Sequence, residues 1–236
     1  MKVAIYSAVF GGYDPEPYDI THMQKENVEY WWITDDTKFQ YTIMNGWNVH
    51  DFWVNPENGK YKYAKSNRFL KLQPHYLEPF KKSDINVYID GNKKLFNIDM
   101  LLDYCQRLYN DPDTDAYFCK HTERDTVQQE VREICRLRRD EPSLVMRQYK
   151  EYREEGLPDD IPLIVASVQI RKTHAPALKV MLDCWWNEVK NKSYRDQISM
   201  PYAIWKTRFN RYKLLNVWDE RLKMIANSNH LKVLNV

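Results

Sequence analysis

The sequence has few cysteines and no long apolar run. Its four cysteines lie far apart and form no CxxC pair, which argues against a disulfide framework or a cysteine-based zinc site. No apolar stretch approaches the roughly 20 residues that a membrane-spanning helix needs, and residues 1–6 read as a strand, not as a signal peptide. We therefore expect a cytoplasmic protein without a transmembrane segment.

An excess of charge of one sign is also missing. The 35 basic and 33 acidic residues leave a formal net charge of +2, which argues against bulk nucleic-acid binding. A hydrophobic content of 43% is typical of a globular protein, and 236 residues suit one large α/β domain or two small ones. Because no repeat, low-complexity tract or linker interrupts the chain, we expect one domain over residues 1–236.

Hydrophobic patterns predict alternating strands and helices. We expect strands over residues 3–10, 28–34, 47–54, 85–89, 117–120 and 164–171. We expect helices over residues 63–73, 98–108, 126–139, 144–155, 176–190 and 199–205, with a weakly patterned tail from residue 212. Asn97 would cap the helix that begins at residue 98. The pattern favours an α/β fold, with a mostly parallel sheet flanked by helices and a helix-rich C-terminal half.

Glycine is scarce as well, with six residues in the chain, so Gly91 at the end of a predicted strand is a specific feature. It stands between Asp90 and Asn92, directly after the apolar run 85–89. In α/β proteins ligands bind at the carboxyl ends of such strands, where a glycine permits a sharp turn and a close approach. Asp90 and Asn92 would then be oxygen donors two residues apart. A solvated turn is the alternative.

A basic segment precedes that strand. Residues 60–71 carry five positive charges and no acid. On a helix, Lys65, Arg68 and Lys71 would lie on one side and would suit a diphosphate. The alternative is a solvated helix face, but the position just before the strand that ends in Asp90 favours the phosphate.

Ionisable residues also follow two later strands. Residues 121–125 include Glu123 and Asp125, at a point where a helix opens, and they suit hydroxyl or phosphate recognition. Alternatively, Asp125 caps the helix and Glu123 is exposed. His174 is a candidate third ligand for a cation or phosphate, or else an ordinary surface residue.

The segment 193–197 follows a predicted helix that contains Trp185 and Trp186. Its Arg195 and Asp196 would cap the next helix, or Asp196 and its neighbours would line a sugar-binding cleft, where polar groups bind hydroxyls and flat rings face the sugar. Both tryptophans cannot face the core from one helix, so we expect one to be packed and the other to lie near the surface.

Taken in order, these segments resemble one glycosyltransferase-like family, long catalogued as a domain of unknown function, whose plant members include turgor-regulation and seed-mucilage proteins. The matching segments are residues 4–14 (AIYSAVFGGYD), 33–35 (ITD), Ala64 with Arg68 and Lys71, 88–92 (YIDGN), 121–125 (HTERD), Arg171 with His174, 185–189 (WWNEV) and 195–199 (RDQIS). The series spans residues 3–205 in the family's order, and the ordered set is far more specific than any single segment.

The resemblance implies a GT-A-like fold with a nucleotide-sugar donor at the carboxyl ends of the first strands. By that analogy, the backbone after the first strand and Asp35 would hold the base and ribose, and two basic residues would face the pyrophosphate. The implied donor-binding residues are Ala8, Val9, Phe10, Asp35, Arg68, Lys71, Asp90 and Gln197.

The resemblance also implies a divalent metal, Mn²⁺ or Mg²⁺. Asp90 would stand where such enzymes usually carry an Asp-x-Asp, and the candidate ligands are Asp90, Asn92 and His174. Asn92 departs from the pattern, because a neutral amide is a weaker ligand for these ions than a carboxylate.

The implied reaction moves a sugar from a nucleotide-diphosphate sugar to a hydroxyl of a glycan or glycoconjugate, as in polysaccharide biosynthesis. Residues 1–110 would form the nucleotide-binding half, 111–210 the acceptor and catalytic half, and 211–236 a tail. Cations must stabilise the leaving diphosphate, and a base must deprotonate the acceptor. Candidate catalytic residues are Asp196, as first choice of base, then Asp125 and Glu123. In a retaining reaction Asp196 would contact donor or acceptor hydroxyls instead.

Two alternatives belong to other classes of protein. A metal-assisted hydrolase would use Asp90, His121, Asp125 and His174, although no HxxEH or HExxH spacing supports it. A carbohydrate- or nucleotide-binding module without catalysis would bind a nucleoside diphosphate and not turn over.

Overall fold

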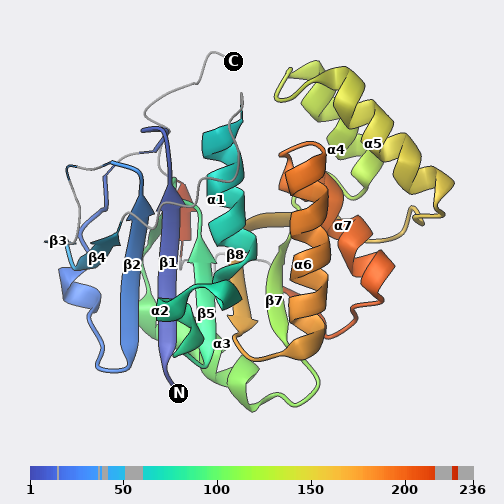
Figure 1. The fold of residues 1–236 in the computed structure, drawn as a ribbon. Helices are drawn as coiled ribbons and strands as arrows, with labels where there is room; N and C mark the ends of the chain where they lie inside the picture. Colours follow the sequence, from blue (N-terminus) through green and yellow to red (C-terminus); the bar gives the residue numbers. More distant parts are fainter. Residues whose placement is uncertain (15, 37, 39–41, 51–60, 216–224, 228–236) are drawn as a thin grey trace.

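The computed structural model of the chain describes residues 1–14, 16–36, 38, 42–50, 61–215 and 225–227, and the main sheet in this part has eight strands. In sequence order they are β1 (Val3–Val9), β2 (Val28–Thr34), β3 (Thr42–Met44), β4 (Trp47–His50), β5 (Ile85–Ile89), β7 (Ala116–Lys120), β8 (Ile164–Lys172) and β9 (Tyr212–Leu215). Their order across the sheet is β3-β4-β2-β1-β5-β8-β7-β9 (Figure 1).

The direction of the strands confirms the predicted mostly parallel sheet. Strands β2 and β5 pair with β1 in parallel, and β4 pairs with β2 in parallel. Strand β7 has the same direction, because β8 is antiparallel to both β5 and β7, and β9 is parallel to β7. Within the described residues, the two opposing strands are β3 and β8. The carboxyl ends of β1, β2, β5 and β7 therefore share one edge of the sheet, which we call the carboxyl edge.

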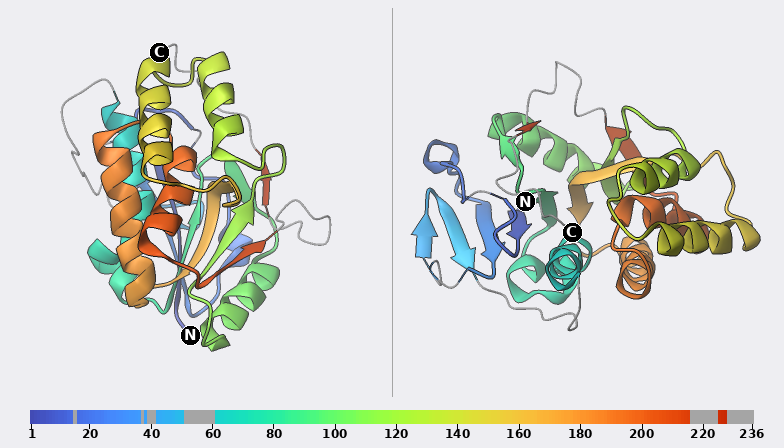
Figure 2. Two further views of the ribbon diagram at one scale, coloured as in Figure 1. Left: turned by 90° about the vertical axis from the view of Figure 1, so that its right-hand side faces the viewer. Right: turned by 90° about the horizontal axis from the view of Figure 1, so that it is seen from above.

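Helices cover both faces of the sheet. They are α1 (Lys62–Leu72), α2 (Glu78–Lys81), α3 (Ile98–Asn110), α4 (Val127–Arg136), α5 (Pro142–Glu154), α6 (Pro176–Asn191) and α7 (Asp196–Thr207). Helix α3 lies on one face, α1 and α6 lie on the other, and the α4–α5 pair stands beside α7 at one end (Figures 1 and 2). This arrangement confirms the predicted α/β class and its helix-rich second half.

The first strand, β1, is buried on both of its faces. Val3 and Ile5 pack into one core with residues of α3, while Ala4 and Tyr6 pack into another with Leu70 of α1. A strand covered on both faces needs apolar residues at consecutive positions, not alternating ones. The continuous apolar run at the start of the sequence is therefore explained by its central position.

Two helix ends follow local capping rules. Asn97 caps α3 by accepting a 3.0 Å hydrogen bond from the backbone N–H of Met100, as the sequence predicts. Thr126, not Asp125, caps α4, and Gln129 completes a reciprocal capping box. The interpretation of Asp125 as the cap is thus wrong by one residue.

The C-terminal part differs from the sequence prediction. The tail from Tyr212 begins with β9, which pairs in parallel with β7, and β10 (Ile225–Asn227) pairs with β6 (Lys93–Leu95). Such short segments carry little periodicity, and their partners lie about a hundred residues away, so no local pattern reports them. The end of the predicted strand 47–54 lies outside the described residues.

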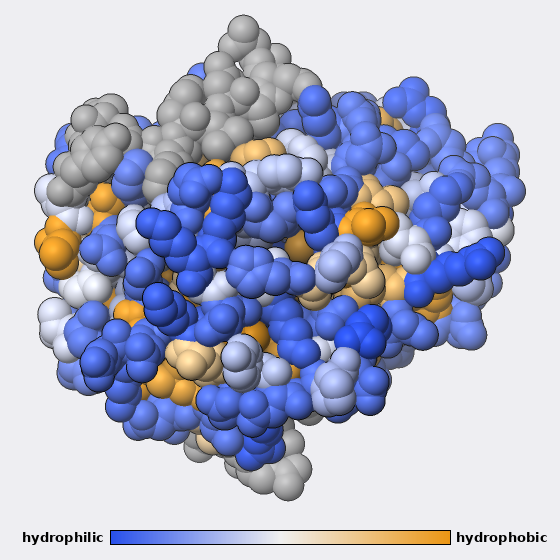
Figure 3. Space-filling view, turned by 60° about the horizontal axis from the view of Figure 1, so that its bottom comes forward, coloured by the Kyte–Doolittle hydropathy of each residue, from blue (hydrophilic) through white to orange (hydrophobic). Residues whose placement is uncertain are grey.

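The lower side of the molecule, as oriented in Figure 1, carries no broad apolar surface among the residues drawn in colour. Figure 3, in which the lower side of Figure 1 comes forward, shows mainly hydrophilic residues with apolar ones in small groups, as is normal for a protein surface. In the described part of the chain, no helix is both long and apolar enough to cross a membrane.

Candidate functional site

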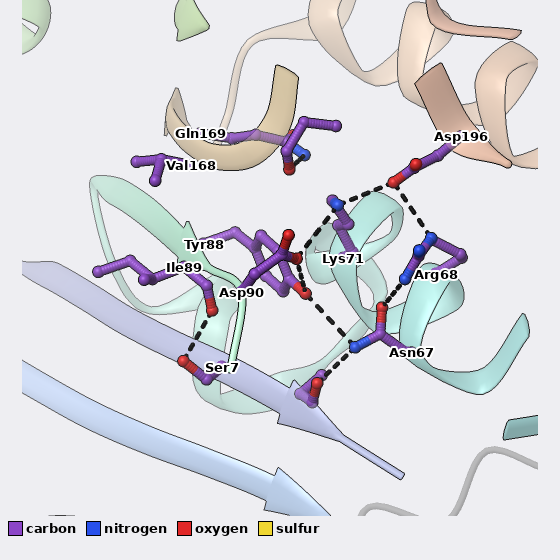
Figure 4. Close-up of polar contacts among 12 residues, drawn as sticks. Ser7, Asn67, Arg68, Lys71, Tyr88, Ile89, Asp90, Val168, Gln169 and Asp196 are labelled. Carbon is purple, nitrogen blue, oxygen red and sulfur yellow. Dashed lines mark hydrogen bonds and ion pairs between the residues drawn. The ribbon is translucent and has the colours of Figure 1, made fainter. Parts of the chain in front are cut away.

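A cluster of polar side chains gathers at the carboxyl edge, where α1 passes the ends of β1 and β5 (Figure 4). Asn67 of α1 donates hydrogen bonds to the carbonyl oxygen of Ala8 and, at 3.4 Å, to the hydroxyl of Tyr88. One helix face is thereby fixed to the ends of two neighbouring strands. Arg68 follows Asn67 directly, and Lys71 lies one turn further along α1.

Asp90, directly after β5, is the exposed carboxylate of this cluster. Its Oδ1 accepts hydrogen bonds from the Tyr88 hydroxyl at 2.8 Å and from Lys71 Nζ at 3.3 Å, and its side chain is 30% exposed. In the part of the chain that the structure describes, Oδ2 receives no hydrogen bond from protein. Asp90 can therefore still bind a ligand.

Gly91 is required here for steric reasons. A Cβ at this position would lie 2.4 Å from Cγ2 of Val9 and 2.9 Å from a carboxylate oxygen of Asp14. The backbone does make a close approach here, to the last residue of β1 and to Asp14 after it. The glycine therefore lets the Asp90 turn pack against the end of the first strand.

Lys71 joins two carboxylates that are far apart in the sequence. Its ammonium nitrogen lies 2.8 Å from Oδ2 of Asp196 and 3.3 Å from Oδ1 of Asp90, while its side chain is only 2% exposed (Figure 4). Nε of Arg68 lies 3.1 Å from the same Oδ2 of Asp196. The predicted residues Arg68, Lys71, Asp90 and Asp196 thus form one cluster, with two cations between two carboxylates.

The charges of this cluster are mutually stabilised. Burial alone would raise the pKa of Asp196, but the neighbouring Arg68 and Lys71 outweigh it and hold that pKa well below its ordinary value. Burial, reinforced by the charge of Asp90, raises the pKa of Tyr88 far above its usual range, so the phenol stays protonated and donates. Because two cations stabilise its carboxylate, Asp196 is a weak base.

The backbone around Asp196 is held from α6. Trp185 is fully buried and donates a 2.9 Å hydrogen bond from Nε1 to the carbonyl oxygen of Asp196. Trp186 is partly buried and meets the ring of Phe69 edge-on at 5.2 Å. The prediction of one packed tryptophan and one nearer the surface is confirmed.

Arg171 of β8 holds the end of α1 that presents Lys71. Its guanidinium is 1% exposed and donates to the carbonyl oxygen of Lys71 at 2.7 Å, to Oε1 of Gln169 at 3.0 Å and to the hydroxyl of Tyr6. The carbonyls at the C-terminus of a helix carry partial negative charge, which suits a buried cation. An arginine within an apolar strand was the sequence signal for this contact, but its partner was not predictable.

The implied nucleotide-binding residues also meet at this edge. Asp35, at the end of β2, accepts a 2.9 Å hydrogen bond from the backbone N–H of Gly11, where φ is +67°. Ala8, Val9 and Phe10 are buried beside this turn. Gln197 lies half-buried in the first turn of α7, next to Asp196.

The segment after β7 lies at the same edge, two strands from β5. Glu123 and Asp125 are largely exposed, with 73% and 78% of their side chains accessible. His121 is buried, and its Nδ1 accepts hydrogen bonds from the backbone N–H groups of Glu123 and Arg124 at 3.1 and 3.0 Å. Burial and the nearby Arg124 lower the pKa of His121, so the ring is neutral at pH 7.

His174 is not part of this cluster. It follows β8, which is antiparallel to β5, so it lies at the opposite edge, where the backbone N–H of Thr173 donates to the carbonyl of Asp84. The length of β5 therefore separates it from Asp90. The hypothesis that His174 shares a metal with Asp90 and Asn92 is wrong, and the hydrolase site built on His174 fails for the same reason.

The remaining metal donors are Asp90 and Asn92. In the described ranges no group of three or more His, Cys, Asp or Glu residues is placed to hold an ion. Mg²⁺ is nevertheless often held by one or two protein oxygens together with substrate phosphates. An open carboxylate oxygen on Asp90 and an amide at Asn92 fit an ion shared with a diphosphate, beside the ammonium of Lys71.

A surface hollow of about 580 Å³ lies between α4 and α5. Its lining includes the amide of Gln128, the ring of Tyr149 and the guanidinium groups of Arg132 and Arg153. Amides and charged groups next to a flat ring are suited to a ligand rich in hydroxyls. A second, water-sized cavity of about 10 Å³ lies under Arg171, at the other edge of the sheet.

Comparison with known proteins decides the family. The model of the TOD1/MUCI70 glycosyltransferase-like domain matches residues 1–230. The chain belongs to this family. A search among curated proteins found no match.

Solved structures share the fold of this glycosyltransferase-like chain. Mouse xyloside xylosyltransferase 1, in its apo form, has 9% identity and a TM-score of 0.52, over 92% of this chain and 86% of that one. Galactosyltransferase LgtC, in complex with donor and acceptor sugar analogs, has 13% identity and a TM-score of 0.51, over 91% and 73%. The bifunctional glycosyltransferase WbbM has 14% identity and a TM-score of 0.50, over 92% and 39%.

At these identities the structural matches establish the fold, which is that of GT-A glycosyltransferases. The family model covers nearly the whole chain and independently indicates the same class. The predicted family and fold are therefore confirmed, and the family of glycosyltransferase-like domains supports the predicted transferase class.

Proposed function

We propose that this glycosyltransferase binds a nucleoside diphosphate sugar at the carboxyl edge and transfers the sugar to a hydroxyl of a glycan or glycoconjugate. The observation that carries the proposal is that Arg68 and Lys71 of α1 both contact the carboxylate of Asp196, while Lys71 also lies 3.3 Å from the carboxylate of Asp90 (Figure 4). Two buried or half-buried cations at the ends of parallel strands suit a diphosphate.

The base and ribose of the donor would lie on the backbone of Ala8, Val9 and Phe10, beside Asp35. The burial of these residues next to the Gly11 turn supports that placement. Gln197, in the first turn of α7, would contact the sugar. Residues 1–110 would thus form the donor half and residues 111–210 the acceptor half.

The first chemical task is to stabilise the departing diphosphate. Negative charge grows on that group as the anomeric C–O bond breaks, and preorganised cations stabilise it most where water is excluded. Lys71 is held by Asp196, Asp90 and the Arg171-bound end of α1, so its ammonium needs little reorganisation. We assign leaving-group stabilisation to Arg68 and Lys71.

The second task is to deprotonate the acceptor hydroxyl. Asp196 was the first choice from sequence, but its paired carboxylate favours a role in orienting Arg68 and Lys71 or in contacting sugar hydroxyls. Glu123 and Asp125 are exposed carboxylates at the same edge, so they are now the preferred candidates for the base.

A divalent ion would be held by Asp90 and Asn92. When bound, Mn²⁺ or Mg²⁺ would supply positive charge next to the diphosphate oxygens. The protein's own contribution at this point is the carboxylate of Asp90, which lies 3.3 Å from the ammonium of Lys71.

The acceptor would extend toward α4 and α5. The hollow with Tyr149, Gln128 and Arg132 lies on the acceptor half and suits a polysaccharide or another glycan. A cytoplasmic location also remains a proposal, supported by the four free thiols, of which Cys105 and Cys119 are buried.

The test is calorimetric titration with UDP, GDP, ADP and CMP and with their common sugar adducts, each with and without Mn²⁺. We expect one nucleotide to bind and the corresponding sugar nucleotide to be consumed in the presence of a glycan mixture. No binding in any arm contradicts the proposal. Tight binding without hydrolysis or transfer would identify the chain as a binding module.

A further inference from the structure

The residue opposite Asp90 in the sheet is Ser167. Strand β8 pairs with β5 in continuous register up to Ile89 and Val168, and the next step places Asp90 opposite Ser167. The backbone confirms this step, because the N–H of Asp90 donates a 2.8 Å hydrogen bond to the carbonyl oxygen of Ser167. Directly opposite residues of antiparallel strands project to the same face, so the two side chains are neighbours.

That face of β8 is the one directed at α1. Asp90, opposite Ser167, directs its carboxylate at Lys71 of α1, so Ser167 lies on the side of the sheet that faces this helix. Arg171 reaches the backbone of Lys71, and Tyr88, opposite Gln169, reaches the carboxylate of Asp90. The Ser167 side chain therefore belongs to the face that carries the cations of the site.

The backbone at Ser167 departs from a regular sheet on its other side. The register between β7 and β8 shifts so that Phe118 faces Gln169 and Cys119 faces Val165, which leaves residues 166–168 without partners on β7. Gln169 closes this bulge through a 3.1 Å hydrogen bond from its Nε2 to the carbonyl of Ala166. Bulges next to active sites commonly redirect a side chain.

The Ser167 hydroxyl is buried and unpaired. Its residue is 6% exposed, and Oγ has no hydrogen-bond partner in the part of the chain that the structure describes. The other serines buried there all have one: Ser7, Ser66, Ser83, Ser193 and Ser199. A buried polar group without a partner is unfavourable and calls for an explanation such as a missing ligand.

We propose that Ser167 is a donor-binding residue of this site, which binds, together with Asp90, one hydroxyl group of the sugar nucleotide. The inference rests on the proposed function and adds a specific contact to it. The serine hydroxyl donates to the ligand oxygen, and the ligand hydroxyl donates to Oδ2 of Asp90. Rotation about the single Cα–Cβ bond can redirect Oγ without any movement of the backbone.

The pairing of a hydroxyl with a carboxylate explains why the ligand group is a hydroxyl and not a phosphate. A carboxylate only accepts hydrogen bonds, so a phosphate oxygen at this position would face the negative charge of Asp90 without a proton between them. A sugar hydroxyl both donates and accepts, and it satisfies the two protein groups at once. The phosphates then remain with Arg68 and Lys71.

The test compares Ser167→Ala with Ser7→Ala. The hydroxyl of Ser7 is also buried beside the end of β5, but it donates a 2.7 Å hydrogen bond to the carbonyl of Ile89 and is therefore structural. We expect Ser167→Ala to melt at or above the wild-type temperature and to bind the sugar nucleotide about 3- to 10-fold more weakly. Ser7→Ala should melt lower and keep wild-type affinity within about twofold.

The nucleoside diphosphate alone, measured by calorimetry on the same proteins, shows which hydroxyl is bound. If Ser167→Ala weakens binding of the sugar nucleotide but not of the nucleoside diphosphate, the bound hydroxyl belongs to the transferred sugar. If it weakens binding of both ligands equally, the bound hydroxyl belongs to the ribose. Ser167→Cys, which keeps the shape of the side chain but donates only weakly, should behave like Ser167→Ala. Unchanged affinity in Ser167→Ala for ligands that the wild type binds overturns this inference alone. Failure of the wild type to bind any nucleotide overturns the proposed function and this inference with it.

Discussion

Replacing Asp196 by asparagine removes the negative charge that the buried Lys71 and the half-buried Arg68 share. Oδ2 of Asp196 lies 2.8 Å from Lys71 Nζ and 3.1 Å from Arg68 Nε, and the carboxylate side chain is only 5% exposed. The amide keeps the shape of the side chain but leaves Arg68 and Lys71 without this counter-charge. The change therefore tests whether Asp196 is part of the architecture of the site.

The expected loss of folding free energy depends on the contacts that Lys71 and Arg68 keep after the substitution. Breaking a buried ion pair by removing one partner costs about 3–5 kcal/mol. Lys71 keeps its contact with Asp90 at 3.3 Å, and Arg68 keeps a hydrogen bond to the side chain of Asn67, so the compensation is partial. We expect Asp196→Asn to lower the free energy of unfolding by about 3 kcal/mol, the low end of that range. For a chain of this size the melting temperature should fall by about 6–12 °C.

Asp159→Asn is the matched control. Asp159 also pairs with an arginine, Arg153, at 2.8 Å, but its side chain is 71% exposed, so its removal should cost no more than about 1 kcal/mol. Urea unfolding at pH 7 measures both variants. In the double variant Asp196→Asn/Arg68→Met the total loss should be smaller than the sum of the two single losses, because the second change removes a charge that the first left unpaired.

At low pH the difference in the free energy of unfolding between wild type and Asp196→Asn should disappear. The pKa of Asp196 is lower in the folded state than the unfolded value of about 3.9. Below that value the unfolded chain takes up a proton before the folded chain does, so the stabilisation is complete above it and declines as the pH falls further. If Asp196→Asn and Asp159→Asn differ by less than about 0.5 kcal/mol at pH 7, the reasoning about the buried ion pairs is wrong.

Three further substitutions test other contacts. Arg68→Ala should weaken nucleoside diphosphate binding by about 1.5–3 kcal/mol while Lys62→Ala changes it little; equal losses in calorimetry would indicate a diffuse electrostatic effect. Gly91→Ala should cost about 1–3 kcal/mol in urea unfolding, since its Cβ would lie 2.4 Å from Val9, and a neutral result would contradict the required close approach. His121 has a lowered pKa, so the wild type should lose stability as the pH falls below the unfolded value of about 6.5, where the unfolded chain binds the proton first. His121→Asn should lose less stability than the wild type between pH 7.5 and 5.5. Equal losses in the two proteins would show that His121 does not contribute to the pH dependence of stability.

Much of the fold was predictable because it is encoded locally. The strand at residues 85–89 was predicted with its exact bounds, since a buried central strand needs consecutive apolar residues and ends at a turn residue. Helix α1 places Arg68 and Lys71 on one side because the two residues are three apart. Asn97 before an apolar periodic run similarly marked the start of α3.

The partners of these residues were not predictable. That Lys71 would lie between Asp90 and Asp196 depends on how α7 packs beside α1, and no local pattern carries that information. The weak basicity of Asp196 is likewise a consequence of tertiary contact, because a pKa responds to charges within a few ångströms, wherever they lie in the chain.

The sequence by itself determined the family, the α/β class, most helices and strands and the residue types at the carboxyl edge, since these depend on local periodicity, turn residues and motif order. Only the tertiary structure decided which of those residues meet. The antiparallel direction of β8 carries His174 to the far edge and places Ser167 opposite Asp90. Strand direction depends on pairing with distant strands, which the alternation of apolar residues along one strand does not encode.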